Sequence, residues 1–148
     1  MFSGSVNYNV SYGDNGKLAP DSEKVKEAVA VAQGKDFVEK MPEQYESHIA
    51  QGGTNVSGGQ KQRLSIARAI AKDPEIYVFD DSFSALDLKT DAALREELAK
   101  RTKNKTVIIV AQRISTILDA NQIIVLEEGK VVGKGTHEEL MKDNETYR

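Results

Sequence analysis

The spacing of apolar residues along the chain predicts helices first, then short strands that alternate with further helices. Apolar side chains recur three and four residues apart at 24–32 and again at 64–71, which is the period of an amphipathic helix. Asp21 or Ser22 is expected to cap the first of these helices. Two continuous apolar runs later in the chain are typical of strands in a sheet covered on both faces. The predicted strands are 76–80 and 106–110, which are these runs, then 122–126 and 130–133, with a hairpin-like turn at Glu128-Gly129-Lys130 between the last two. The further helices are predicted at 37–40, 88–101 and 114–118.

The helix that continues to about Lys72 begins with Ser57-Gly58-Gly59-Gln60, a sequence suited to hold a phosphate group. Adjacent glycines let the backbone approach an oxyanion with no Cβ in the way, and the N–H groups and positive dipole end of the helix face that anion. Ser57 and Gln60 also have the spacing of a capping box. This motif alone therefore fits both a phosphate site and an ordinary capped helix.

The strand at 76–80 delivers two carboxylates, Asp80 and Asp81, at its end, and Ser84-Ala85-Leu86-Asp87 follows. Open parallel sheets bind their ligands at the carboxyl ends of the strands. We expect Asp80 to hold Mg²⁺ through water and Asp81 to act on the water that attacks a terminal phosphate. The two motifs in this order predict a nucleotide site.

With these motifs the chain resembles the ATP-binding domain of ABC transporters over almost all of its length. The matching segments are Val56 to Gln60, similar to the family's LSGGQ signature, Ile76 to Asp80, similar to Walker B, Ser84 to Asp87, similar to the D-loop, and Val107 to Arg113, similar to the strand before the switch residue. The resemblance implies an α/β fold, the C-terminal part of a P-loop NTPase domain of ABC type. The implied fold has a helical subdomain followed by parallel-sheet core strands. The chain divides into a helical signature subdomain at 1–75, incomplete on its N-terminal side, and the C-terminal part of the P-loop NTPase core, with Walker B, the D-loop and the switch region, at 76–148. No G-x-x-x-x-G-K-[ST] occurs, so the Walker A part is missing.

The resemblance also implies a role. ABC domains build each ATP site from two subunits, so Ser57, Gly58, Gly59 and Gln60 are expected to contact ATP held by a partner, and the D-loop to contact the opposing subunit. ATP and Mg²⁺ are the implied ligands. The implied partners are a second, non-identical ATPase subunit and the transmembrane domain of an exporter, which places the chain at the cytoplasmic face of the cell membrane.

Two positions depart from the family pattern. Asp81 stands where the family usually has Glu, and Gln112 stands at the switch position where it usually has His. A displacement of about 1 Å in a catalytic group costs around 10²-fold in rate, and an amide cannot take a proton near neutral pH. Both changes, with Gln51 where exporters often have Glu, resemble the degenerate-site subunit of heterodimeric multidrug-type exporters. Sequence drift in an ordinary subunit is the alternative.

Composition and charge narrow the range of possible functions further. The 148 residues are 39% hydrophobic and 29% charged, as in one globular domain or less. The net charge of −3 offers no basic stripe for nucleic acid. No cysteine occurs, which fits a reducing compartment.

Without Walker A we expect the isolated chain to be inactive as an ATPase. The competing hypothesis is a truncated module, or a gene remnant, that only interacts with a partner.

Overall fold

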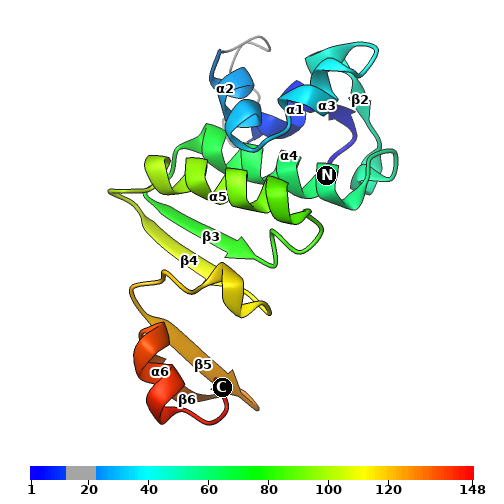
Figure 1. Cartoon of the computed structure of the whole chain (residues 1–148). Coiled ribbons are helices and arrows are strands. Elements are labelled where there is room, and N and C mark those ends of the chain that lie inside the picture. The colour runs from blue at the N-terminus through cyan, green and yellow to red at the C-terminus, as the bar shows by residue number, and fades with distance from the viewer. Residues whose placement is uncertain (13–22) are drawn as a thin grey trace. The chain divides into compact units, whose positions relative to one another are not determined.

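The computed structural model describes residues 1–12 and 23–148 (Figure 1). They form two compact units, residues 1–108 and residues 109–148. The expected helix caps Asp21 and Ser22 lie outside the described residues. The division at residue 75 into a signature subdomain and core strands follows function rather than packing, and it stays a prediction.

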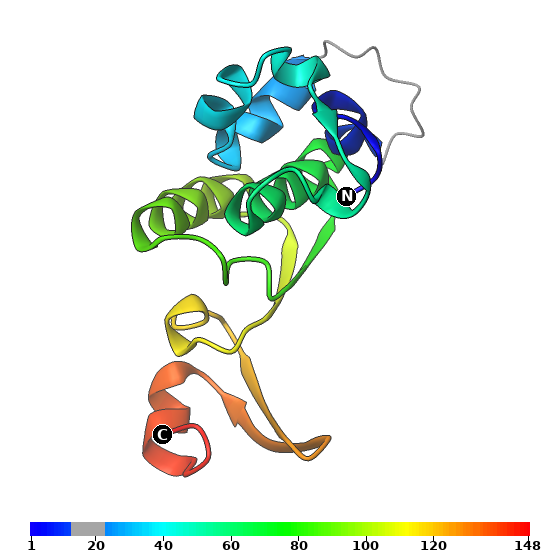
Figure 2. The same cartoon turned by 90° about the vertical axis from the view of Figure 1, so that its right-hand side faces the viewer.

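The first unit is built around α4 (Gly58–Lys72), the longest helix of the described chain. Its apolar stripe is buried as the helical period predicts, with Leu64 only 1% exposed. The helix α4 packs against two shorter helices, α1 (Val6–Val10) and α2 (Glu23–Val31) (Figure 2). The remaining elements of this part are β1 (Gly4–Ser5), α3 (Lys35–Glu39), η2 (Gln44–Glu46), β2 (His48–Ile49) and η3 (Gln51–Gly53), and β1 pairs antiparallel with β2.

Arg68 fastens the N-terminal segment to α4. Its guanidinium donates to the Asn9 carbonyl at 2.8 Å and to Asn9 Oδ1 at 2.9 Å. Asn9 is fully buried and also exchanges hydrogen bonds with the Phe2 backbone, accepting from its N–H and donating to its carbonyl, each at 2.9 Å. Arg68 lies over the Phe2 and Tyr12 rings as well, which lowers the cost of burying its charge. The sequence pattern did not predict α1, and this network explains how five residues stay helical.

The strand β3 (Ile76–Asp80) is followed by α5 (Leu88–Arg101) and β4 (Thr106–Val110), and the first unit ends within β4, after residue 108. Both strands and α5 were predicted with these bounds. Thr106 N donates to the Glu75 carbonyl at 3.0 Å, so the two strands start side by side, and the intervening helix is the connection that parallel neighbours require.

One face of β3 is covered and the other is not. Tyr77 and Phe79 are buried and stack with ring centroids 5.8 Å apart. The helices α4 and α5 both lie on one side of β3 (Figure 1). Ile76 and Val78 alternate with them and are 59% and 62% exposed. The prediction of a sheet covered on both faces is therefore wrong for this chain, because no described segment of the first unit packs on the second face.

The second unit is a hairpin with one helix. It contains η4 (Ile114–Thr116), β5 (Ile123–Glu127), β6 (Lys130–Gly135) and α6 (His137–Asp143). The strands pair antiparallel through Glu128 and Gly129, both at positive φ, which confirms the predicted turn. The helix predicted at 114–118 is wrong in kind: only one 3₁₀ turn forms, since this segment is short and rich in β-branched residues, which have a lower helix propensity.

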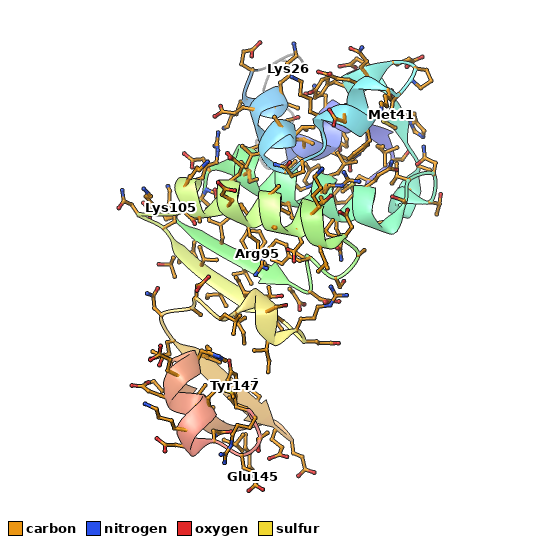
Figure 3. The ribbon with its side chains drawn as sticks, in the orientation of Figure 1. Lys26, Met41, Arg95, Lys105, Glu145 and Tyr147 are labelled. Atoms are coloured by element: carbon orange, nitrogen blue, oxygen red, sulfur yellow. The ribbon has the colours of Figure 1, made fainter. Side chains whose placement is uncertain are left out.

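A small core holds the second unit together. Ile123, Leu140 and Tyr147 are buried against one another. Tyr147, labelled in Figure 3, lies beside α6, and its hydroxyl is 2.9 Å from His137 Nδ1. His137 is the first residue of α6, inside a capping box made by Thr136 and Glu139. Within 1–12 and 23–148, no helix combines the length and the apolar character that crossing a membrane would require.

Candidate nucleotide site

The predicted phosphate-binding turn forms at the start of α4. Ser57 is the N-cap, and its hydroxyl accepts from Gln60 N at 3.1 Å while Gln60 Oε1 accepts from Ser57 N at 3.1 Å. The capping box is thus confirmed. The helix's own ladder begins only with Lys61 N, which donates to the Ser57 carbonyl at 2.9 Å. The helix therefore makes no use of the N–H groups of Gly58 and Gly59, which its geometry leaves for an outside acceptor.

The two glycines of this turn have different reasons to lack a side chain. A Cβ at Gly59 would lie 3.0 Å from the Ala85 carbonyl oxygen, a tight contact with backbone, so packing inside the chain favours glycine there. A Cβ at Gly58 would meet only the Ala85 Cβ, at 3.6 Å, which is ordinary van der Waals contact. Gly58 is also exposed. Nothing in the described structure demands glycine at position 58, so the space in front of it is free for a ligand.

The carboxylates Asp80 and Asp81 lie at the end of β3, and both are exposed. Asp81 has φ of 48°, the left-handed region that Asp and Asn tolerate better than most residues. An open depression of about 190 Å³ runs beside them, with a lining of Lys61, Gln62, Ser65, Asp80, Asp81 and Ser82.

The described residues contain no cluster of three or more acidic or histidine ligands that would enclose a metal ion. Mg²⁺ does not need such a cluster, because it keeps several waters and is bound through one or two carboxylates together with phosphates. The single exposed carboxylate of Asp80 fits this pattern. It would hold the ion only with a nucleotide present.

The predicted D-loop, residues 84–87, lies against the first turns of α4. Gln62 Nε2 donates to the Asp81 carbonyl at 3.0 Å and to Ser84 Oγ at 2.9 Å, and Gln62 Oε1 accepts from Ala85 N at 2.8 Å. Leu86 is buried, and Asp87 caps α5 by accepting from Thr90 N at 3.1 Å. Sequence reasoning missed Gln62, because nothing in its spacing shows that its side chain spans two segments 19 to 23 residues apart.

Arg63 fixes the same turn of α4 from the other side. It donates to the Gly59 carbonyl at 3.2 Å and to the Gln33 carbonyl at 3.0 Å, and it lies over the Phe37 ring with 4.7 Å from its guanidinium carbon to the centroid. Partial burial lowers the pKa of Arg63 below its usual value, and Asp87 opposes that shift. The residue was absent from the predicted site, and it acts by holding the turn in place.

Gln112, the predicted switch residue, lies in the second unit, exposed just after β4. The structure thus brings Ser57, Gly58, Gly59 and Gln60 together with the loop at Ser84 and Ala85, and it places Asp80 and Asp81 along one depression. The assignment of Gln112 to the same site as Asp81 stays a prediction.

Comparison with known proteins agrees with this arrangement. A protein-family model described as "ABC transporter" matches residues 4–84. An uncharacterized ABC transporter ATP-binding protein of Mycobacterium bovis is 46% identical over 147 residues, which are 99% of this chain and 25% of that protein. ATP-binding cassette sub-family B member 5 of Mus musculus is 40% identical over 147 residues, 99% of this chain and 12% of that protein.

A solved structure gives the same result. A bacterial Atm1-family ABC exporter with ATP bound matches with a TM-score of 0.92 and 33% identity, over 99% of this chain and 25% of that one. The chain spans a quarter or less of the length of these relatives. The predicted fold class, part of an ABC-type NTPase domain, is confirmed. Since the family match covers more than half of the residues, the chain belongs to the ABC transporter family.

Proposed function

We propose that this chain is the part of an exporter's ATP-binding domain that presents its signature turn to ATP held by a second subunit. The proposal rests on the open space at Gly58: the packing of this chain does not require glycine at that position. A phosphate at that position would accept hydrogen bonds from the N–H groups of Gly58 and Gly59, and it would lie at the positive end of the α4 dipole. The Ser57 hydroxyl accepts from Gln60 N and still has its own proton to donate.

In this proposal the chain's own nucleotide site is degenerate. Asp80 would hold Mg²⁺ through water, and the ion would neutralise charge on the phosphates of ATP. Asp81 would approach the attacking water with a carboxylate one methylene shorter than the family's usual Glu. Gln112 could orient a phosphate oxygen by hydrogen bonding but could not supply a positive charge. Hydrolysis would then occur mainly at the partner's site.

The proposed partners follow from the family and from charge. A non-identical ATPase subunit would supply the competent Walker motifs, and a transmembrane domain would place the chain at the cytoplasmic face of the membrane. The similarity to an Atm1-family exporter and to a sub-family B member supports this assignment. A net charge of −3 gives no support for a nucleic-acid partner.

Substitution of Gly58 in the full-length protein, assembled with its partner, tests the proposal. Gly58→Glu should lower ATPase turnover on the order of 10²-fold, because it places a carboxylate where a phosphate must bind, and Gly58→Ala should cause a smaller loss. Both variants should keep the wild-type melting temperature, since the new Cβ meets only ordinary contact. Gln122→Glu, which adds the same charge at an exposed position in the second unit, is the matched control. Unchanged turnover in Gly58→Glu would favour the interaction-only module.

A further inference from the structure

The side chain of Gln62 joins two segments that, in the proposed function, belong to different ATP sites. Gln62 lies in α4, five residues after Ser57, and so moves with the turn that faces the partner's ATP. Its amide reaches the loop that follows this chain's own carboxylates, with bonds to the Asp81 carbonyl, Ser84 Oγ and Ala85 N at 2.8 to 3.0 Å.

The packing around these bonds makes the connection rigid. The Ala85 carbonyl lies so close to Gly59 that a Cβ there would be 3.0 Å from it, so the loop already rests on the first turn of α4. Ser84 Oγ donates to the Asp81 carbonyl at 3.3 Å, which closes the loop on itself. A sliding of α4 by one hydrogen-bond length would break all three contacts of Gln62 together.

The contacts at position 62 use both the donor and the acceptor of the amide side chain. Two contacts require a donor and one requires an acceptor, and glutamine supplies both from one planar group. Methionine has a similar length and shape but would supply neither. Glutamate would still accept a hydrogen bond from Ala85 N and could accept one from the Ser84 hydroxyl. It would lose the hydrogen bond to the Asp81 carbonyl.

We propose that Gln62 is a positioning residue that holds the loop at 81–85 in register with the signature turn, so that the two ATP sites of the assembled transporter are coupled through one side chain of this subunit. The proposal rests on the proposed function above. Gln62 need not touch nucleotide in this role. It fixes the distance between Gly59 and Ala85, and through it the approach of the signature to the partner's ATP.

Steady-state ATPase kinetics of the full-length complex test the proposal. Gln62→Met should lower kcat roughly 10-fold or more, because a misplacement of about 1 Å costs around 10²-fold, while KM for ATP changes little. Gln62→Glu should fall between Gln62→Met and wild type, in proportion to the bonds it keeps. Gln122→Met is the control for loss of an exposed amide and should leave kcat unchanged.

Two further measurements separate positioning from a general loss of structure. The melting temperature of each complex should not follow the order of the kcat losses. In Ser84→Ala combined with Gln62→Met, the loss of kcat should be smaller than the product of the single losses, because both remove the same bond. Fully multiplicative losses would overturn the proposal.

The kcat of Ser57→Arg, measured in parallel, distinguishes failure of the inference about Gln62 from failure of the proposed function. If Ser57→Arg abolishes turnover and Gln62→Met retains wild-type kcat, the inference about Gln62 is wrong and the proposed function stands. If Ser57→Arg itself retains turnover, the proposed function fails and the role of Gln62 fails with it. An intermediate kcat for Gln62→Glu, with wild-type KM, supports the positioning role.

Discussion

At the scale of single residues, backbone conformation decides which substitutions give a clean answer. Asp81 has a positive φ that asparagine also tolerates, so Asp81→Asn removes the charge and leaves the turn in place. Gly59 is constrained by the Ala85 carbonyl, so Gly59→Asp would disturb the chain's own loop as well as any bound phosphate. Ser57 and Gly58 are therefore better positions for testing the signature than Gly59.

Asp87 offers a pH test at this scale. Hydrogen bonds from Thr90 lower the pKa of its carboxyl, so the stability that the cap contributes is present above the pKa of the unfolded chain and is lost as the pH falls through the folded value. Asp87→Ala should lower the urea midpoint at pH 7, and the difference from wild type should shrink below about pH 4. The difference in urea midpoint between Asp87→Asn, which keeps an uncharged acceptor, and Asp87→Ala should not change with pH. A difference between Asp87→Ala and wild type that is constant from pH 7 to pH 3 would contradict this account.

At the scale of elements, α4 links the N-terminal segment, the signature turn and the loop after β3. Its start is set by the capping box and its core side by a helical stripe, which are local signals, and both were predicted from the sequence. Its tertiary contacts were not. Arg68 and Gln62 are polar residues on a helix, and only the folded chain shows that they bond to Asn9 and Ala85.

Arg68 provides the test for this element. Arg68→Ala should lower the free energy of unfolding by about 2–3 kcal/mol, because it removes two charge-assisted hydrogen bonds and leaves the buried Asn9 groups without these donors. Arg68→Lys should restore part of the loss, since an ammonium is a single point charge that cannot span both oxygens in a fixed plane. Urea unfolding measures the effect. Equal stability of Arg68→Ala and wild type would show that α1 is held to α4 by apolar packing alone.

The same limit explains the other misses among the elements. Helix α1 has five residues and depends on the fully buried Asn9, which no periodicity reveals. The segment after Gln112 has apolar residues at helical spacing and forms only η4, because such a short segment with β-branched residues does not sustain a helix. The four longer strands were predicted to within two residues and the hairpin turn was predicted correctly, since their signals are local, whereas the two-residue strands β1 and β2 were not predicted. The cover of the sheet is a tertiary property, and there the prediction was wrong.

At the scale of the whole molecule, the exposed face of β3 is the main departure from a closed fold. Contiguous apolar surface of this kind is a site for association. The 148-residue chain should therefore form concentration-dependent oligomers in analytical ultracentrifugation, and Val78→Lys should shift it toward monomer. Met141→Lys, on α6, replaces another exposed apolar side chain, one that is 43% exposed, and should not change the association. A wild-type chain that stays monomeric at high concentration and unfolds sharply would count against this expectation.

The division of labour between the two ATP sites is the central claim, and one side-by-side measurement tests it most directly. Steady-state ATPase turnover is compared for Ser57→Arg and Asp81→Asn in the full-length protein with its natural partner. Ser57→Arg should abolish most activity, because it places bulk in the partner's competent site, and Asp81→Asn should do much less. If Asp81 were a working general base, its loss would cost about 10²-fold or more, roughly 3 kcal/mol of barrier. An Asp81→Asn loss as large as that of Ser57→Arg would contradict the account, because this chain's own site would then be catalytic.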